Sequence, residues 1–154
     1  MRRGQIRPLS SAERDLACAV FGDAVDLAPV RLFAVPLATR IFVPGRLAGR
    51  DWIFWPWRSA PDDAASAPLP VQAALVHELV HVWQAQQGVF LPLAKLKAGD
   101  GAGAYEHPPR GAEFAALNIE QQAVLVERAF LAARGRPTAW TLAEYRASLP
   151  FDVA

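Results

Sequence analysis

The stretch Leu75-Val76-His77-Glu78-Leu79-Val80-His81-Val82-Trp83-Gln84 decides how this chain is interpreted. It places the pattern HExxH inside an apolar segment, which predicts a buried helix over about residues 70–87. At about 100° per residue, His77 and His81 lie one turn apart on one helix face, so both imidazoles can reach a single Zn²⁺. Glu78 points away from that line and can act on a metal-bound water as a general base.

A catalytic zinc site needs a third ligand, and the longer pattern HExxHxxGxxH does not supply it. Gln84 and Gln87 stand where that pattern has its glycine and its last histidine, which excludes the metzincin arrangement. A carboxylate from a second helix remains, as in His₂Glu sites. The apolar periodicity ahead of Gly135 predicts such a helix over about residues 112–134.

Three glutamates of this second helix, Glu113, Glu120 and Glu127, are spaced by seven residues and therefore lie nearly on one face. Glu120 lies in the middle of the apolar stripe, where an unpaired carboxylate is costly, so we predict it as the third zinc ligand. Glu127 is the runner-up ligand, and a buried ion pair with an arginine is the alternative role for Glu120. The helix dipole alone accounts for Glu113. With Glu120 as ligand, we expect Glu127→Gln to leave zinc affinity nearly unchanged.

Residues 91–111 are rich in glycine and proline, which predicts a long irregular loop of a kind that often carries function. His107 in this loop is a candidate ligand or transition-state donor. Tyr105 is a candidate O–H donor to the scissile carbonyl. Both residues have an alternative role in packing alone.

The remaining segments predict an α+β fold. Ser10-x-x-Glu13 is a capping box that predicts a helix over about 11–21, and Thr141-x-x-Glu144 predicts a short last helix. Three runs of branched and aromatic residues predict strands at 30–35, 40–43 and 52–55. We expect one domain over 1–154, with residues 1–9 flexible and 136–154 forming the short helix and a tail. The strand at 52–55 is the expected place for a peptide to add by β-augmentation.

Composition narrows the class of protein further. A chain of 154 residues that is 53% hydrophobic is no disordered segment, and a net charge of +1 gives no basis for a nucleic-acid partner. No apolar run is long enough for a transmembrane helix, and the basic start lacks the apolar stretch of a signal peptide. We expect a cytoplasmic location by default, with export by a route that reads no signal peptide left open. The single cysteine, Cys18, is expected to be a buried thiol.

Residues 75–84 resemble the signature helix of bacterial zincin-like domains found beside Vgr/Rhs elements and extracellular contractile injection systems. The resemblance covers roughly residues 10–131 and includes Phe21–Asp26, Val30–Leu32, Ile53–Pro56 and Asn118–Ala123. The last of these segments resembles the E-x-x-A pattern that carries the third zinc ligand in several gluzincin families, which again implies Glu120. One departure is Val124, which stands where many E-x-x-A-D motifs have an aspartate that supports a metal histidine.

The sequence therefore predicts a compact zincin-like α+β domain in which a small sheet packs on the HExxH helix and a second helix carries the last ligand. One Zn²⁺ is held by His77, His81 and Glu120, and Glu78 is the general base in the hydrolysis of a peptide or protein substrate. The alternative is a non-catalytic, zinc-stabilised binding or adaptor module, and a further one is a metal-free domain with a vestigial motif. The resemblance implies components of a secretion or injection apparatus as partners, and delivery by a contractile injection system.

Overall fold

The computed structural model describes residues 1–99, 101–151 and 153 and has the expected α+β fold. Its mixed sheet has the strand order β1-β2-β4-β3, with β2 and β4 parallel and the other two pairs antiparallel. The strands are β1 (Ile6–Pro8), β2 (Val30–Val35), β3 (Phe42–Leu47) and β4 (Arg50–Pro56). The helices are α1 (Ser11–Phe21), α2 (Leu69–Gln86), α3 (Leu91–Ala98), α4 (Ile119–Ala133) and α5 (Leu142–Ser148), with 3₁₀ turns η1 (Ala102–Tyr105) and η2 (Phe114–Ala116).

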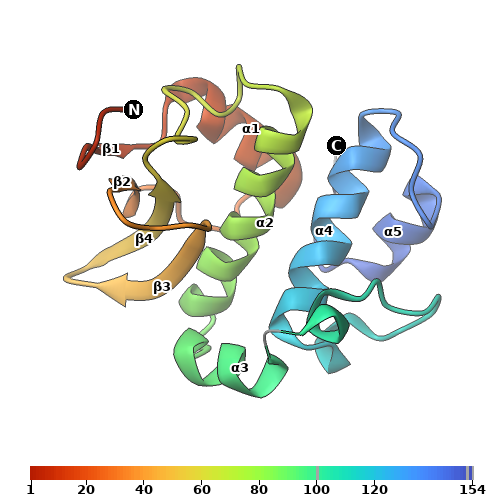
Figure 1. Cartoon of the computed structure of the whole chain (residues 1–154). Coiled ribbons are helices and arrows are strands. Elements are labelled where there is room, and N and C mark those ends of the chain that lie inside the picture. Colours follow the sequence, from red (N-terminus) through yellow and green to blue (C-terminus); the bar gives the residue numbers. More distant parts are fainter. Residues whose placement is uncertain (100, 152, 154) are drawn as a thin grey trace.

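Helix α2 lies at the centre of the molecule, between the sheet and α4, and α5 packs on the far side of α4 (Figure 1). Its side chains are buried on several sides, with Leu75, Leu79 and Val82 fully inaccessible. A helix that is apolar all round is stable only when it is covered from several directions. The HExxH pattern is therefore held in the core. No helix among the described residues combines the length and the apolar character needed to cross a membrane.

Helix α4 begins later than the sequence predicts. The Asn118 side chain accepts hydrogen bonds from the backbone N–H groups of Glu120 and Gln121, and the Gln121 side chain accepts one from the backbone N–H of Asn118. This capping box fixes the helix start at Ile119 in place of residue 112, and the preceding turn is η2. As a result Glu120 lies in the first turn of α4.

The prediction of an irregular loop over 91–111 is wrong in its first part, which forms α3. Pro92 suits the first turn of a helix, and Gly99, with φ of 80°, ends it. Leu91 is the buried residue of this helix. Because most of α3 is exposed, its sequence has no apolar stripe from which a helix can be recognised.

Strand β4 occupies an interior position in the sheet and pairs with β2 on one side and β3 on the other. The expectation that a peptide adds to residues 52–55 is therefore wrong, because both edges of β4 are already paired. Among the described strands, β3 and β1 form the edges. The pairing of β3 with β4 is interrupted between Phe42 and Gly45, where Gly45 takes a φ of 108° that suits a bulge.

The N-terminal segment is tied to the rest of the molecule. Residues 1–9, which we expected to be flexible, contain β1, which pairs with β2. The buried Glu13 carboxylate accepts hydrogen bonds from both terminal nitrogens of Arg7, at 2.6 and 2.7 Å, and from the backbone N–H groups of Ser10 and Ala64, at 2.8 and 2.7 Å. We name this group the Glu13 latch, since it joins β1, α1 and the loop before α2.

Cys18 is exposed, so the expectation of a buried thiol is wrong. The buried side chains of α1 are those of Glu13, Leu16, Ala17, Val20 and Phe21. These positions follow the spacing of a single helix face, and residue 18 lies outside it.

Candidate metal centre

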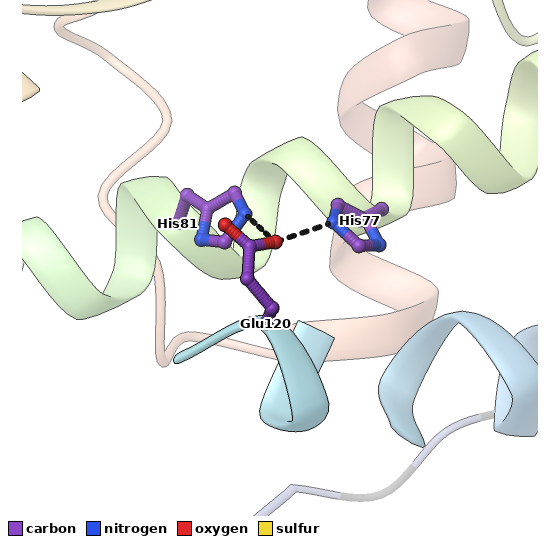
Figure 2. Close-up of side chains that lie close together, drawn as sticks. All are labelled: His77, His81 and Glu120. Carbon is purple, nitrogen blue, oxygen red and sulfur yellow. Dashed lines mark hydrogen bonds and ion pairs between the residues drawn. The ribbon is translucent and has the colours of Figure 1, made fainter. Parts of the chain in front are cut away.

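Helices α2 and α4 bring together the three residues that the sequence predicts as zinc ligands. His77 and His81 lie one turn apart on α2, and Glu120 approaches both from the first turn of α4 (Figure 2). Glu120 Oε2 lies 3.4 Å from His77 Nε2 and 3.2 Å from His81 Nε2. One ligand atom from each residue lies within 4.8 Å of the others, which defines a cluster that could hold a metal ion.

The spacing and chemistry of the cluster fit zinc. Ligand atoms bound to a tetrahedral zinc at about 2.0–2.1 Å are separated from one another by about 3.3–3.4 Å. The separations of 3.2 and 3.4 Å from Glu120 Oε2 match that spacing. They are longer than the roughly 2.7–2.9 Å of a strong hydrogen bond between charged nitrogen and oxygen. Two imidazoles and one carboxylate are also a donor set that catalytic zinc sites use.

The network around His81 fixes which of its nitrogens faces the cluster. Gln84 Nε2 donates to the backbone carbonyl of Ile119 at 2.9 Å and to Gln122 Oε1 at 2.8 Å. Because a carbonyl can only accept, these bonds settle the orientation of the Gln84 amide. Its Oε1 then accepts a hydrogen bond from His81 Nδ1 at 2.8 Å. Nδ1 therefore carries a proton, and Nε2, which lies 3.2 Å from Glu120 Oε2, is the nitrogen available to a metal.

His77 is supported by a carboxylate in the same way. Its Nδ1 lies 3.1 Å from Glu127 Oε2, while its Nε2 faces Glu120. A histidine that binds a metal through one nitrogen commonly donates its other N–H to a carboxylate, which orients the ring and raises its basicity. Glu127, the runner-up ligand, thus contacts a ligand from outside the cluster. Glu127 lies one turn further along α4 than Val124, the position at which many E-x-x-A-D motifs have the supporting aspartate.

Electrostatics in the cluster favour positive charge. Burial lowers the pKa of His77, but its hydrogen bonds to Glu120 and Glu127 outweigh that effect and raise the pKa to about 9. Burial raises the pKa of Glu120, but its hydrogen bonds to His77 and His81 outweigh burial and hold this pKa below its usual range. Glu120 is therefore ionised at neutral pH, as a metal ligand has to be.

Glu78 lies beside the cluster without belonging to it. Its side chain is buried, and its Oε2 has no hydrogen-bond partner. A buried carboxylate oxygen without a donor is unfavourable unless another group supplies one. The position next to His77 therefore suits a residue that acts on a water or a substrate held at the cluster.

The cluster forms part of the lining of a cleft of about 520 Å³, together with Glu78. Tyr105 also lines this cleft, so the structure places it near the cluster. His107 is held elsewhere, because its Nδ1 donates to the Pro108 carbonyl at 2.8 Å and its Nε2 accepts from the Tyr145 hydroxyl at 2.9 Å. We therefore leave His107 out of the proposed site.

Sequence reasoning missed Lys95, which reaches the cluster from α3. Its Nζ lies 3.7 Å from Glu120 Oε1, whereas the contacts of Glu120 with the two imidazoles are made by Oε2. Because the ion pair engages Oε1, it favours metal binding by Glu120 through Oε2 alone. No signal in the sequence points to this lysine, because it lies in the segment predicted as a loop.

Comparisons with known proteins add a relative and a solved structure, whereas no family model matches the chain. The chain is 33% identical over 141 residues to the type VI secretion system spike protein VgrG2b of Pseudomonas aeruginosa. That match includes 81% of the chain but spans only 13% of the length of the spike protein. The chain is also similar to the solved structure of the effector domain of Pseudomonas aeruginosa VgrG2b, with a TM-score of 0.69 and 31% identity. This second match covers 92% of the chain and 80% of that domain.

Proposed function

The chain belongs to the family of the VgrG2b effector domain, and from this premise we propose that it is a zinc-dependent metallopeptidase domain with a zincin-like arrangement. One observation carries the proposal. The cluster of His77, His81 and Glu120 lies in a cleft beside Glu78, whose Oε2 is buried without a partner. Such an arrangement provides metal ligands and a base at one place.

The number of ligands favours catalysis over a structural role. Structural zinc sites are closed by four protein ligands, whereas catalytic sites use three and keep one position open. Among the described residues the cluster contains three, His77, His81 and Glu120. The second candidate function, a non-catalytic zinc-stabilised adaptor, has no use for the unpartnered carboxylate of Glu78.

The chemistry follows from the placement of the chain's own groups. When bound, zinc would supply a Lewis acid that polarises a carbonyl and makes water a nucleophile near neutral pH. Glu78 takes the proton from the attacking water and then delivers it to the departing amine. Tyr105, which lines the cleft, would donate a hydrogen bond to the carbonyl oxygen as negative charge develops on it.

The substrate backbone can be bound by strand β3. β3 is an edge strand, and Phe42 at its start lines the cleft. An extended peptide added to this edge would satisfy the unpaired backbone groups of the strand and would pass the metal ligands. Phe42 and Ile41 would flank that peptide on one side.

The secretion context comes from the relatives. VgrG2b is named as a type VI secretion spike protein, and its similar domain is named as an effector domain. We infer that this domain is likewise carried with a type VI spike and acts after delivery, on a protein substrate in the recipient compartment. Its partners would then be spike components and the substrate.

Metal analysis and one substitution test the proposal. Protein purified without added metal should contain about one zinc per chain, and less than about a tenth of an equivalent with no uptake of added zinc would refute it. Glu78→Gln should keep the zinc and the fold but reduce hydrolysis of fluorogenic peptides by about 10²–10⁴-fold. Glu113→Gln, an exposed carboxylate outside the cluster, is the matched control. Unchanged turnover in Glu78→Gln would exclude the base, and zinc binding without any peptidase activity would favour the adaptor.

A further inference from the structure

Gln84 is a buried polar side chain in the core of the molecule, and the proposed hydrolysis makes no direct use of it. It lies on α2, three residues after His81, and is only 1% exposed. Burying an amide is unfavourable unless its polar atoms are hydrogen-bonded. Gln84 meets this requirement, because its Nε2 donates two hydrogen bonds and its Oε1 accepts one. The role of the residue therefore depends on which groups these partners are.

Two backbone carbonyls fix the direction of every hydrogen bond in this network. Gln122 Nε2 donates to the Phe114 carbonyl at 3.0 Å, so Gln122 Oε1 is left to accept. Gln84 Nε2 donates to that oxygen at 2.8 Å and to the Ile119 carbonyl at 2.9 Å. Gln84 Oε1 is then the acceptor for His81 Nδ1 at 2.8 Å. Both amides are therefore held in one orientation, and they engage one particular nitrogen of His81.

The Gln84 amide also joins the two helices that carry the metal ligands. Its acceptors Ile119 and Gln122 lie on α4, on either side of Glu120 in the sequence. Ile119 is the first residue of α4, so the bond to its carbonyl holds the turn from which Glu120 extends. His81 Nε2 in turn lies 3.2 Å from Glu120 Oε2 (Figure 2). One side chain thus contacts one ligand directly and holds the backbone beside another.

We propose that Gln84 is a positioning residue of the metal centre, which keeps Nε2 of His81 directed at the metal position and sets the spacing between His81 and Glu120. The inference rests on the proposed function, because it concerns the same zinc site. A hydrogen bond to the outer nitrogen of a metal-binding imidazole orients the ring, and its loss commonly weakens metal binding by about 10–100-fold. Gln84 stands where the pattern HExxHxxGxxH has a glycine, which has no side chain to make these contacts.

A purely structural role is the competing explanation, and Gln86 on the same helix provides the comparison. Its Oε1 accepts from the backbone N–H of Asp26 at 2.9 Å, and its Nε2 donates to the Asp26 carbonyl and to Asp51 Oδ2, both at 2.8 Å. Neither aspartate belongs to the metal cluster or to the lining of the cleft. Gln86 therefore joins segments of the fold through the same set of three bonds, but its partners are not metal ligands.

The experiment compares Gln84→Met with Gln86→Met in the full chain. Methionine keeps the length of the side chain and suits a helix, so each variant loses its hydrogen bonds with little change in shape. Zinc affinity is measured by titration against a competing chelator at one fixed pH. The visible absorption of Co²⁺ added to the metal-free protein reports the number and arrangement of its ligands. Thermal melting identifies the temperatures at which both variants are folded.

We expect Gln84→Met to lose about 10–100-fold in zinc affinity and to change the Co²⁺ spectrum. Gln86→Met should stay within about twofold of the wild-type affinity and keep the wild-type spectrum, because it lies outside the network. Equal affinities and equal spectra in the two variants would overturn the inference and leave the peptidase proposal standing. The expected pattern in a protein that cleaves no peptide would retain Gln84 as a positioning residue and refute the peptidase. A wild-type protein that binds neither metal would refute both.

A measurement on the wild-type protein decides the matter if Gln84→Met does not fold. Long-range proton–nitrogen correlation spectra of the zinc-loaded protein show which imidazole nitrogens carry protons. We expect a proton on His81 Nδ1 that exchanges slowly with solvent, because its hydrogen bond to Gln84 is buried. Rapid exchange of that proton, or metal bound to Nδ1 with the proton on Nε2, would overturn the inference.

Discussion

Glu13 and Glu120 are both buried glutamates near the start of a helix, yet their surroundings differ in kind. Glu13 accepts four hydrogen bonds of 2.6–2.8 Å, from the Arg7 guanidinium and from two backbone N–H groups. Glu120 has three nitrogen partners, and they lie at 3.2, 3.4 and 3.7 Å. A carboxylate that serves the fold is saturated by nearby donors. The longer contacts of Glu120 come from a cluster that could hold a metal ion.

The comparison also separates two roles for charge. In the Glu13 latch, the positive partner is an arginine of the chain itself, and the group joins three segments of the fold. In the metal centre, two of the partners are imidazoles, and each can lose a proton and bind a metal through the nitrogen that faces Glu120. The first arrangement is complete within the chain, whereas the second is suited to receive a cation from outside.

The largest effect is expected from breaking the latch. Glu13→Ala leaves the guanidinium of Arg7 and the backbone N–H groups of Ser10 and Ala64 without their acceptor, and Arg7 is only 14% exposed. Removing one partner of a buried ion pair typically costs about 3–5 kcal/mol. Urea denaturation of the metal-free variant should show that loss in the free energy of unfolding. A change below about 1 kcal/mol would show that the latch is weaker than its geometry indicates.

A second prediction concerns the metal centre. Glu120→Gln removes the charged ligand but keeps its shape, so zinc affinity should fall by more than about 100-fold, beyond the loss seen when a supporting residue is disturbed. Titration against a competing chelator at one fixed pH measures it. Glu13→Gln is the matched control, and it should retain its zinc affinity under conditions in which the variant is folded. If both variants keep their zinc, the third ligand is not Glu120, and the contrast between the two glutamates has no functional meaning.

Some of this arrangement could be predicted from the sequence, for a physical reason. His77, Glu78 and His81 lie within five residues, where helix geometry alone decides which side chains share a face. The placement of Glu120 also followed from local periodicity, because an ionised group in the middle of an apolar stripe requires a partner. Those strands of the sheet that are rich in branched and aromatic residues could also be recognised from the sequence.

What could not be predicted depends on contacts between distant segments. The support of His77 by Glu127 and the approach of Lys95 to Glu120 are set by how α2, α3 and α4 pack. The strand order could not be predicted from the sequence either. Strand β4 was therefore expected at an edge of the sheet, whereas β3 lies at that edge. Helix α3 was missed because an exposed short helix has little hydrophobic periodicity to reveal it.

A third prediction sharpens the comparison from the outer side of the centre. The sequence predicts no effect of Glu127→Gln on zinc affinity, but the contact between Glu127 Oε2 and His77 Nδ1 at 3.1 Å changes that expectation. A carboxamide can still accept a hydrogen bond from the imidazole N–H, but it lacks the negative charge. Zinc affinity should therefore fall, by no more than the roughly 10–100-fold seen when a supporting residue is lost altogether. Chelator titration of Glu127→Gln beside Glu113→Gln provides the measurement and its control. An unchanged affinity would mean that Glu127 only packs against His77.

The last prediction is a dependence on pH, and its sign follows from His77. In the metal-free protein the pKa of His77 is raised from 6.5 to about 9, despite burial, by its hydrogen bonds to Glu120 and Glu127. A raised folded-state pKa contributes stability that is fully present below pH 6.5 and is lost as the pH rises through about 9. Zinc has to displace that proton, so its apparent affinity should rise by about tenfold per pH unit over the same window. Chelator titrations at several pH values measure this slope, and urea denaturation of the metal-free protein should show stability falling where zinc affinity rises. His77→Ala should remove the fall in stability. A zinc affinity independent of pH between 6.5 and 9 would show that His77 is already neutral, and that the negative charge around it is balanced by another group.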